Sequence, residues 1–153
     1  MKFSVVLSVY HKEKPDFIEQ SLISIINNNR KPSEIIIMED GLLTSELNSI
    51  IKKWVSNYPD IIKSVSLATN QGLGKALNEG LRHCSNEWIF RMDTDDICLP
   101  DRFEKQIAFI QENPHISLIG SNTEEFSEDM TISNGYRNVA CEHNDIIKLA
   151  GLS

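Results

Sequence analysis

Three aspartates stand close together in the middle of the chain, at Asp93, Asp95 and Asp96, just after the apolar run 88–90. In an extended backbone the side chains of residues i and i+2 leave the same face, so Asp93 and Asp95 can converge while Asp96 turns away. Neighbouring carboxylates repel each other by roughly 1 to 4 kcal/mol unless a cation lies between them. Mg²⁺ and Mn²⁺ prefer such oxygen ligands and often share them with a phosphate group. The cluster therefore indicates a site for a divalent cation and a phosphorylated ligand.

A plainer interpretation of the same residues is also open. A cluster of this kind can be a solvated acidic loop, in which Asp96 or Asp101 caps the following helix. The two interpretations can be distinguished by the strands and helices around the cluster and by the residues at the ends of the other strands.

Apolar runs and amphipathic segments alternate along the chain, which is the pattern of an α/β fold with a mostly parallel sheet flanked by helices. The expected strands are residues 3–9, 34–38, 63–68, 87–92 and 116–121. The expected helices begin at Pro15, at Thr44 or Ser45, near Gly72, at Pro100 and at Asn144. The acidic cluster is then expected at the carboxyl end of the fourth strand.

The bulk properties limit the class of protein. With 153 residues the chain is long enough for one domain with its own core. The formal net charge of -7 argues against a nucleic acid as the main partner, because such binding depends on clustered Lys and Arg. The three cysteines show no disulfide or zinc spacing, and no apolar stretch approaches the roughly 20 residues that cross a bilayer. We expect a cytoplasmic protein, with any peripheral membrane association carried by segments absent from this sequence.

Polar and aromatic side chains follow each of the first four expected strands. Ligands of open α/β sheets bind at the carboxyl ends of the strands, so these side chains are expected to meet. They are Ser8 and Tyr10 after the first strand, Asp40 after the second, Lys75 after the third, and residues 93–96 after the fourth. An aromatic face, a carboxylate acceptor and a lysine charge are groups that bind a nucleoside diphosphate.

Two nearby features allow other interpretations. Arg91 shares a face with Asp93, and its guanidinium can either pair with that carboxylate or contact a phosphate; we favour the pairing. Gly72 and Gly74 lack the third glycine position of a dinucleotide fingerprint and follow the third strand instead of the first. A nicotinamide dinucleotide site is therefore not expected.

Four segments, taken in order, resemble the successive motifs of family 2 glycosyltransferases with the GT-A fold. They are residues 5–10, 34–41, 70–80 and 91–103. The specificity of this resemblance lies in the order and spacing of all four segments over about the first 120 residues. It implies a Rossmann-like, GT-A nucleotide-binding half, and it favours the metal and phosphate interpretation of the acidic cluster.

The resemblance further implies a site for a nucleotide-diphospho-sugar, with a UDP-sugar as the expected donor. The implied site residues are the nucleotide-sugar-binding Ser8, Tyr10, Asp40, Lys75 and Asp93 and the metal ligands Asp95 and Asp93. Within this set the first three would hold the nucleoside and Lys75 would lie near the nucleotide. Asp93 would reach the ribose or the metal, and Asp95 would ligate Mn²⁺ or Mg²⁺ on the diphosphate.

The sequence departs modestly from the family pattern. Glu39 stands where the family often has a second Asp, and Leu42 where a small polar residue is common. Because both positions follow the second strand, beside the expected nucleoside, the departures concern base preference more than nucleotide binding.

The implied reaction is an inverting transfer of a sugar to a saccharide or lipid-linked acceptor in surface-polysaccharide synthesis. We expect a single GT-A-type domain over residues 1–153, truncated at its C-terminal end. Residues 1–121 would form the nucleotide-sugar-binding core and residues 122–153 the start of the acceptor-side region. The general base, usually an Asp in the family, is expected beyond Ser153, so the catalytic residue is unknown.

Two alternative functions remain at this point. One is a non-catalytic module that binds a nucleotide or a metal. The other is a phosphatase of the haloacid dehalogenase type, because residues 93–97 resemble its nucleophile loop. That loop normally follows the first strand, whereas here it follows the fourth.

Overall fold

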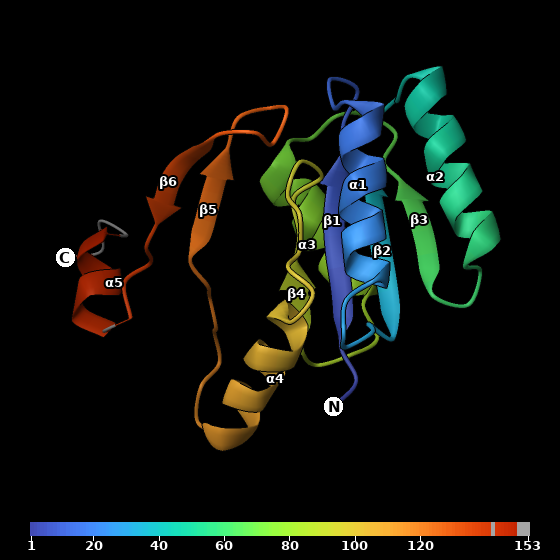
Figure 1. Ribbon diagram of the computed structural model, residues 1–153. Coiled ribbons are helices and arrows are strands. Elements are labelled where there is room, and N and C mark those ends of the chain that lie inside the picture. The colour runs from blue at the N-terminus through green and yellow to red at the C-terminus, as the bar shows by residue number, and fades with distance from the viewer. Residues whose placement is uncertain (142, 150–153) are drawn as a thin grey trace. The chain divides into compact units, whose positions relative to one another are not determined.

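The computed structural model describes residues 1–141 and 143–149. It divides into two compact units, residues 1–109 and residues from 110 onward. Helices and strands alternate in the first unit, as Figure 1 shows, and the second unit contains a two-stranded hairpin and a short helix. The expected division at residue 121 into a donor-binding core and an acceptor-side region stays a prediction.

A four-stranded parallel sheet forms the centre of the first unit. Its strands are β1 (Ser4–Val9), β2 (Glu34–Glu39), β3 (Ile62–Ser66) and β4 (Ile89–Arg91). The strand order is β3-β2-β1-β4, and every neighbouring pair is parallel. β1 and β2 are buried along almost their whole length, as expected for continuous apolar runs covered on both faces. The predicted α/β class with a mostly parallel sheet is confirmed.

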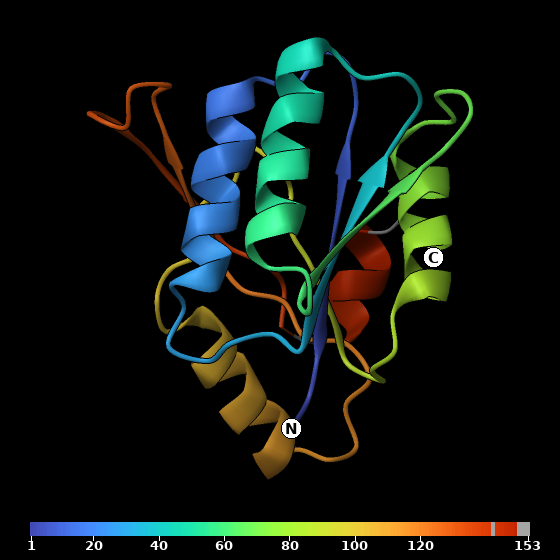
Figure 2. The same ribbon diagram turned by 90° about the vertical axis from the view of Figure 1, so that its right-hand side faces the viewer.

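Helices cover both faces of this sheet (Figure 2). The helices of this part of the chain are α1 (Pro15–Ile26), α2 (Ser45–Asn57), α3 (Leu73–His83) and α4 (Arg102–Glu112). α1 and α2 lie on one face and α3 lies on the other. Thr44 is the N-cap of α2, because its hydroxyl accepts a hydrogen bond from the Leu47 N–H at 3.3 Å. α4 begins two residues after the predicted start at Pro100, and its Phe103 ring packs on Phe3 and Phe90.

α3 approaches the sheet closely because Gly80 faces it. A Cβ at Gly80 would lie 2.6 Å from Val6 Cγ2 and 2.9 Å from Met38 Cγ. Ala76, one turn earlier, belongs to the buried cluster that also contains Val6, Ile36 and Met38. Small residues at 76 and 80 thus set the spacing between α3 and the two central strands.

The second unit differs from the sequence prediction. Residues 116–121 do not form the expected fifth strand; β5 (Thr123–Phe126) pairs instead with β6 (Ser133–Arg137) in an antiparallel hairpin. The turn between them is organised by the Asp129 carboxylate, which accepts hydrogen bonds from the Ser127 and Thr131 hydroxyls. A strand requires a hydrogen-bonded neighbour. The turn around Asp129 brings β6 beside β5 and so provides that neighbour. α5 (His143–Leu149) follows the hairpin, close to the expected helix start.

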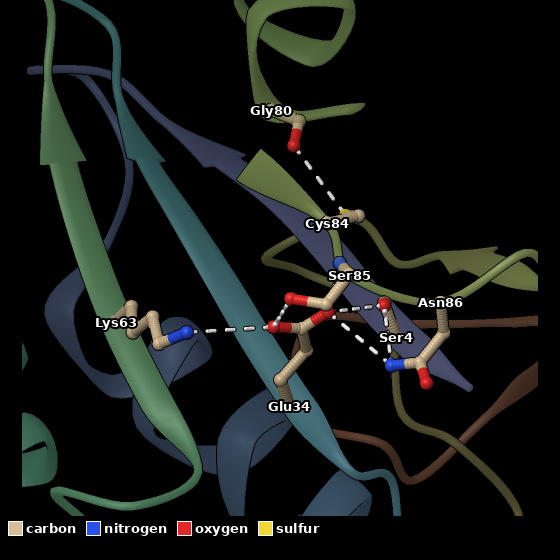
Figure 3. A network of polar contacts seen from close by, with 7 residues as sticks. All are labelled: Ser4, Glu34, Lys63, Gly80, Cys84, Ser85 and Asn86. Atoms are coloured by element: carbon tan, nitrogen blue, oxygen red, sulfur yellow. Dashed lines mark hydrogen bonds and ion pairs between the residues drawn. The ribbon is translucent and has the colours of Figure 1, made fainter. Parts of the chain in front are cut away.

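A buried carboxylate organises the amino ends of the strands. Glu34, the first residue of β2, has a side chain that is only 6% exposed. Figure 3 shows its partners: it accepts hydrogen bonds from the Ser4 hydroxyl at 2.6 Å and from the Ser85 N–H and hydroxyl, and Lys63 Nζ lies 3.6 Å away. Burial alone would raise the pKa of Glu34, but the hydrogen bonds from Ser4 and Ser85 and the charge of Lys63 outweigh it and lower the pKa. One carboxylate therefore joins three strands to the segment before β4.

This arrangement predicts an acid-sensitive contribution to stability. A carboxyl group whose pKa is lower in the folded than in the unfolded protein stabilises the fold above the unfolded value of about 4.5, and the contribution is lost as the pH falls through the folded value. We expect Glu34→Gln to lower the free energy of unfolding at pH 7 by about 2 kcal/mol. It should also flatten the decline in stability below pH 4.5. Urea denaturation between pH 3 and pH 7 measures both effects.

The matched control is Glu87→Gln, which changes an exposed carboxylate of the same unit. It should leave the unfolding free energy and its pH dependence close to those of the unmodified chain. Equal effects of the two substitutions would contradict the role assigned to Glu34.

Candidate functional site: an acidic cavity at the strand ends

The strand order creates a crevice at the carboxyl edge of the sheet. The chain passes from β1 to β2 on one side, whereas β4 pairs with the other side of β1. Such a reversal of strand order is where open α/β sheets bind ligands. A cavity of about 410 Å³ lies there. It is lined by Ser8, Tyr10, Glu13, Asp40, Asn70, Gly72, Leu73, Arg91, Asp93, Thr94 and Asp95.

The cavity brings together most of the residues singled out from the sequence. Ser8, Tyr10, Asp40, Asp93 and Asp95 all line it. They come from the ends of β1, β2 and β4, although 85 positions separate Ser8 from Asp93 in sequence. Tyr10 is 38% exposed, so part of this residue is accessible to solvent at the cavity.

Lys75 lies elsewhere. It is an exposed residue in the first turn of α3 and lines a separate hollow of about 230 Å³, together with Leu67, Gln71 and Arg82 among others. The structure does not bring its side chain into the acidic cavity. Its expected place near a nucleotide stays a prediction.

Asp40 connects two of the loops that form the cavity. Its carboxylate accepts hydrogen bonds from the Gln71 N–H at 2.7 Å and the Gly72 N–H at 2.9 Å, and the residue is 2% exposed. Gly41 allows the close approach that these bonds require. Its φ is +84°, and a Cβ there would lie 2.5 Å from the Asn70 backbone nitrogen. The Asp40-Gly41 pair thus joins the end of β2 to the start of α3.

We therefore expect Gly41→Ala to disrupt this junction. A side chain at positive φ is strained, and the contact with Asn70 leaves a Cβ no space. The free energy of unfolding should fall by about 2 kcal/mol or more. The control is Gly74→Ala, since no atom lies within 4 Å of a Cβ there. It should leave stability unchanged or slightly higher in urea denaturation, and a similar loss in both variants would refute the packing argument.

Arg91 and Asp93 form a bidentate ion pair. Arg91 Nη2 lies 2.7 Å from Asp93 Oδ1 and 2.8 Å from Oδ2, and Arg91 Nε donates to Oδ1 at 3.1 Å. The pairing that we favoured for Arg91 from the sequence is present. Both side chains are partly exposed, so the pair contributes little to stability, at most about 1 kcal/mol. Its effect is to fix the orientation of the Asp93 carboxylate at the cavity wall.

The acidic cluster itself is a turn, not an extended segment. β4 ends at Arg91, and the Asp96 N–H donates to the Asp93 carbonyl at 3.3 Å. The extended backbone expected for Asp93 and Asp95 is therefore wrong, but both residues still line the cavity while Asp96 does not. Thr94, between them, is 2% exposed and also lines the cavity, where its side chain is hydrogen-bonded to Glu13.

Glu13 is a cavity residue that the sequence reasoning missed. It lies in the loop after β1, where its N–H donates to the Tyr10 carbonyl at 3.1 Å, and its carboxylate is hydrogen-bonded by the Thr94 side chain. Burial raises the pKa of Glu13, as do the charges of Asp95 and Asp93, and the Thr94 bond opposes the shift. Its position after a strand end is the same signal that identified Ser8 and Tyr10.

The charges around the cavity are unbalanced. Four carboxylates, from Glu13, Asp40, Asp93 and Asp95, face one guanidinium, that of Arg91. Burial and then the charges of Asp93 and Asp95 raise the pKa of Asp96, so the repulsion extends beyond the lining residues.

Two carboxylates with phosphate oxygens and water are a typical donor set for Mg²⁺ or Mn²⁺. Across residues 1–141 and 143–149, no group of three or more His, Cys, Asp or Glu side chains is placed to hold a metal by itself. Asp93 and Asp95 supply two such carboxylates at the cavity, which fits an ion that takes its remaining oxygens from a phosphorylated ligand and water.

Solved structures share this architecture and define the class. The chain superposes on the Staphylococcus aureus TarS 1–349 complex with UDP-GlcNAc with a TM-score of 0.63 and 25% identity, covering 79% of this chain and 38% of that one. The mannosyltransferase PcManGT of Pyrobaculum calidifontis, solved with GDP-Man and Mn²⁺, gives a TM-score of 0.63 at 22% identity, covering 71% and 32%. The second likeness concerns the fold alone. The fold is that of GT-A type transferases.

The sequence matches the family described as "Glycosyl transferase family 2" over residues 4–150. The chain belongs to glycosyl transferase family 2, as the order of its motifs implied. The match leaves the haloacid dehalogenase alternative without support.

Two curated relatives are similar over most of the chain. An uncharacterized glycosyltransferase of Haemophilus influenzae is 45% identical over 148 residues, which are 97% of this chain and 55% of the relative. The UDP-Gal:alpha-D-GlcNAc-diphosphoundecaprenol beta-1,3-galactosyltransferase of Escherichia coli is 43% identical over 125 residues, which are 82% and 45%. The chain thus spans about half the length of these relatives. No helix among its described residues is long and apolar enough to cross a membrane.

Proposed function

We propose that this chain binds the donor of an inverting glycosyltransferase, a nucleotide-diphospho-sugar, in the cavity at the strand ends. The observation that carries the proposal is the excess of three negative charges among the lining residues. A diphosphate is itself anionic, so such a cavity repels it unless a cation lies between the two. Asp93 and Asp95 of the acidic turn would hold Mg²⁺ or Mn²⁺ there, and the ion would supply the positive charge that neutralises the leaving diphosphate.

The lining residues suggest a division of roles within the cavity. Ser8, Tyr10 and Asp40 lie at the ends of the two central strands, and we assign them to the nucleoside. Asp40 already accepts two backbone hydrogen bonds, yet its oxygens keep lone pairs for a base N–H or a ribose hydroxyl. We assign Asp95 to the metal and Asp93 to the metal or the ribose.

The donor and acceptor follow from similarity to other proteins. TarS was solved with UDP-GlcNAc, and the Escherichia coli relative is named for a UDP-Gal donor and a diphosphoundecaprenol acceptor. We therefore propose a UDP-sugar donor and a saccharide or lipid-linked acceptor in surface-polysaccharide synthesis, on the cytoplasmic side. In an inverting transfer the acceptor hydroxyl attacks the anomeric carbon opposite the departing diphosphate, after loss of its proton to a base. We assign no residue of this chain as that base.

The donor-site proposal predicts that UDP with Mn²⁺ stabilises the chain. With ligand about 100-fold above its Kd, the melting temperature should rise by about 5 to 10 °C. Neither UDP nor Mn²⁺ alone should give the full shift, because each needs the other to offset charge. Asp95→Asn should remove most of the shift, since it takes away a metal ligand at an exposed position. Differential scanning fluorimetry measures these shifts.

Asp60→Asn provides the matched control, because it removes an equal charge from an exposed position outside the cavity. It should keep the full shift. If no nucleoside diphosphate raises the melting temperature of the unmodified chain in the presence of Mn²⁺ or Mg²⁺, the donor-site proposal is wrong.

A further inference from the structure

A row of polar side chains on α1 and just beyond it faces the acidic turn. Ser21, Ser24 and Asn28 follow one another at helical spacing, and all three are bonded to the segment that carries the aspartates, residues 92–101. We call this segment the acidic loop. It joins β4 to α4 and contains no regular secondary structure.

The hydrogen bonds run in order along both partners. The Ser21 hydroxyl donates to the Asp93 carbonyl at 3.1 Å, and the Cys98 N–H donates to Ser24 Oγ at 2.9 Å. Asn28 Nδ2 donates to the Leu99 carbonyl at 2.7 Å and lies 3.2 Å from Cys98 Sγ. Two side chains of α1 and that of Asn28, just beyond it, thus hold the acidic loop at its start and towards its end, with the turn between them.

Two of these three polar residues are buried and the third is half-buried. Ser21 is fully buried, Asn28 is 1% exposed, and Ser24 is only partly exposed. A buried hydroxyl or amide destabilises a protein unless it is hydrogen-bonded, and alanine would fill a helix face at less cost. The helix therefore carries polar residues where the loop backbone needs partners. The loop has weak internal bonding at the turn, since the Asp96 N–H to Asp93 carbonyl distance is 3.3 Å.

We propose that Ser21, Ser24 and Asn28 are positioning residues for donor binding, which hold the acidic loop so that Asp93 and Asp95 converge on one cation. The inference rests on the proposed donor site and adds a requirement to it. The carboxylates alone do not define the site; their separation is set by side chains of α1 and by Asn28 just after it, and none of these three is among the residues that line the cavity.

The role of Glu13 agrees with this arrangement. Its carboxylate is bonded to Thr94, the residue between the two aspartates, and Glu13 lies in the loop just before α1. The segment that begins after β1 therefore contacts the turn from the cavity side through Glu13 and from the interior through Ser21. Glu13 contacts the Thr94 side chain and Ser21 contacts the Asp93 carbonyl, so both contacts restrain the short segment that contains Asp93 and Asp95.

Ser24→Ala is the direct test. It removes the acceptor of the Cys98 N–H and keeps a good helix former. We expect UDP affinity in the presence of Mn²⁺, measured by titration calorimetry, to fall about five- to tenfold, the loss typical of one hydrogen bond. Amide exchange followed by NMR should become faster at Cys98 and its neighbours, while the amides of β1 and β2 keep their protection. Ser24→Thr, which keeps the hydroxyl, should restore both properties.

A second substitution and two controls separate positioning from general stability. Asn28→Asp replaces the donor to the Leu99 carbonyl by a carboxylate and should weaken UDP binding as Ser24→Ala does. Ser49→Ala, at an exposed position of α2, should change neither property. Ile51→Val lowers stability through the core of the same unit, and UDP affinity should stay unchanged.

The outcomes distinguish a failure of the positioning role from a failure of the donor-site proposal on which it rests. If the unmodified chain binds no UDP with Mn²⁺, the donor-site proposal fails and the positioning role fails with it. If the chain binds UDP but Ser24→Ala and Asn28→Asp bind it as tightly as Ser49→Ala does, only the positioning role is overturned. The same holds if Cys98 exchanges faster in Ser24→Ala without a loss of affinity, or if Ile51→Val weakens binding equally.

Discussion

Parallel pairing on both sides of β1 is the constraint on which the remaining structure depends. Parallel strands need crossover connections, and each crossover here contains a helix that covers one face of the sheet. Because β2 and β4 pair with opposite sides of β1 and all three strands run in the same direction, their carboxyl ends lie at one edge of the sheet. Ser8, near the end of β1, and the acidic turn after β4 consequently line the same cavity. The cavity is a result of topology before it is a result of side-chain chemistry.

Irregular segments around the cavity are stabilised by side chains of neighbouring elements. The Asp40 carboxylate satisfies the two amides that precede α3, and polar groups of α1 satisfy the acidic loop. A backbone amide or carbonyl that is buried without a partner is costly, so a loop outside a helix or a sheet needs such bonds. The chain thus keeps several loops ordered at one edge while leaving the carboxylates of Asp93 and Asp95 at the surface of the cavity. Neighbouring side chains bond the backbone of the acidic loop, so the carboxylates of Asp93 and Asp95 stay accessible to a ligand in the cavity.

The sequence predicted the first unit well because its signals are local and strong. Continuous apolar runs identified β1 and β2, and the Thr44 cap and helical spacing identified α2. The strand predicted over residues 116–121 is absent, because an apolar run indicates burial but does not ensure a neighbouring strand to pair with. The position of Lys75 depends on how α3 turns against the sheet, which the motif order does not specify. Glu13 was within reach of the same argument that gave Ser8, and the helix residues that hold the acidic loop were not, because they contact it across more than 70 positions of sequence.

The two ends of the sheet use carboxylates in opposite ways. At the amino end Glu34 is surrounded by donors, and its charge is compensated by groups that belong to the protein. At the carboxyl end the lining carboxylates exceed the positive charge of the lining residues. The carboxylate that joins the amino ends of the strands therefore lies at the opposite end of the sheet from Asp93 and Asp95. A change at Asp93 or Asp95 leaves the bonds of Glu34 intact, whereas a change at Asp40 also removes the bonds that join β2 to the start of α3.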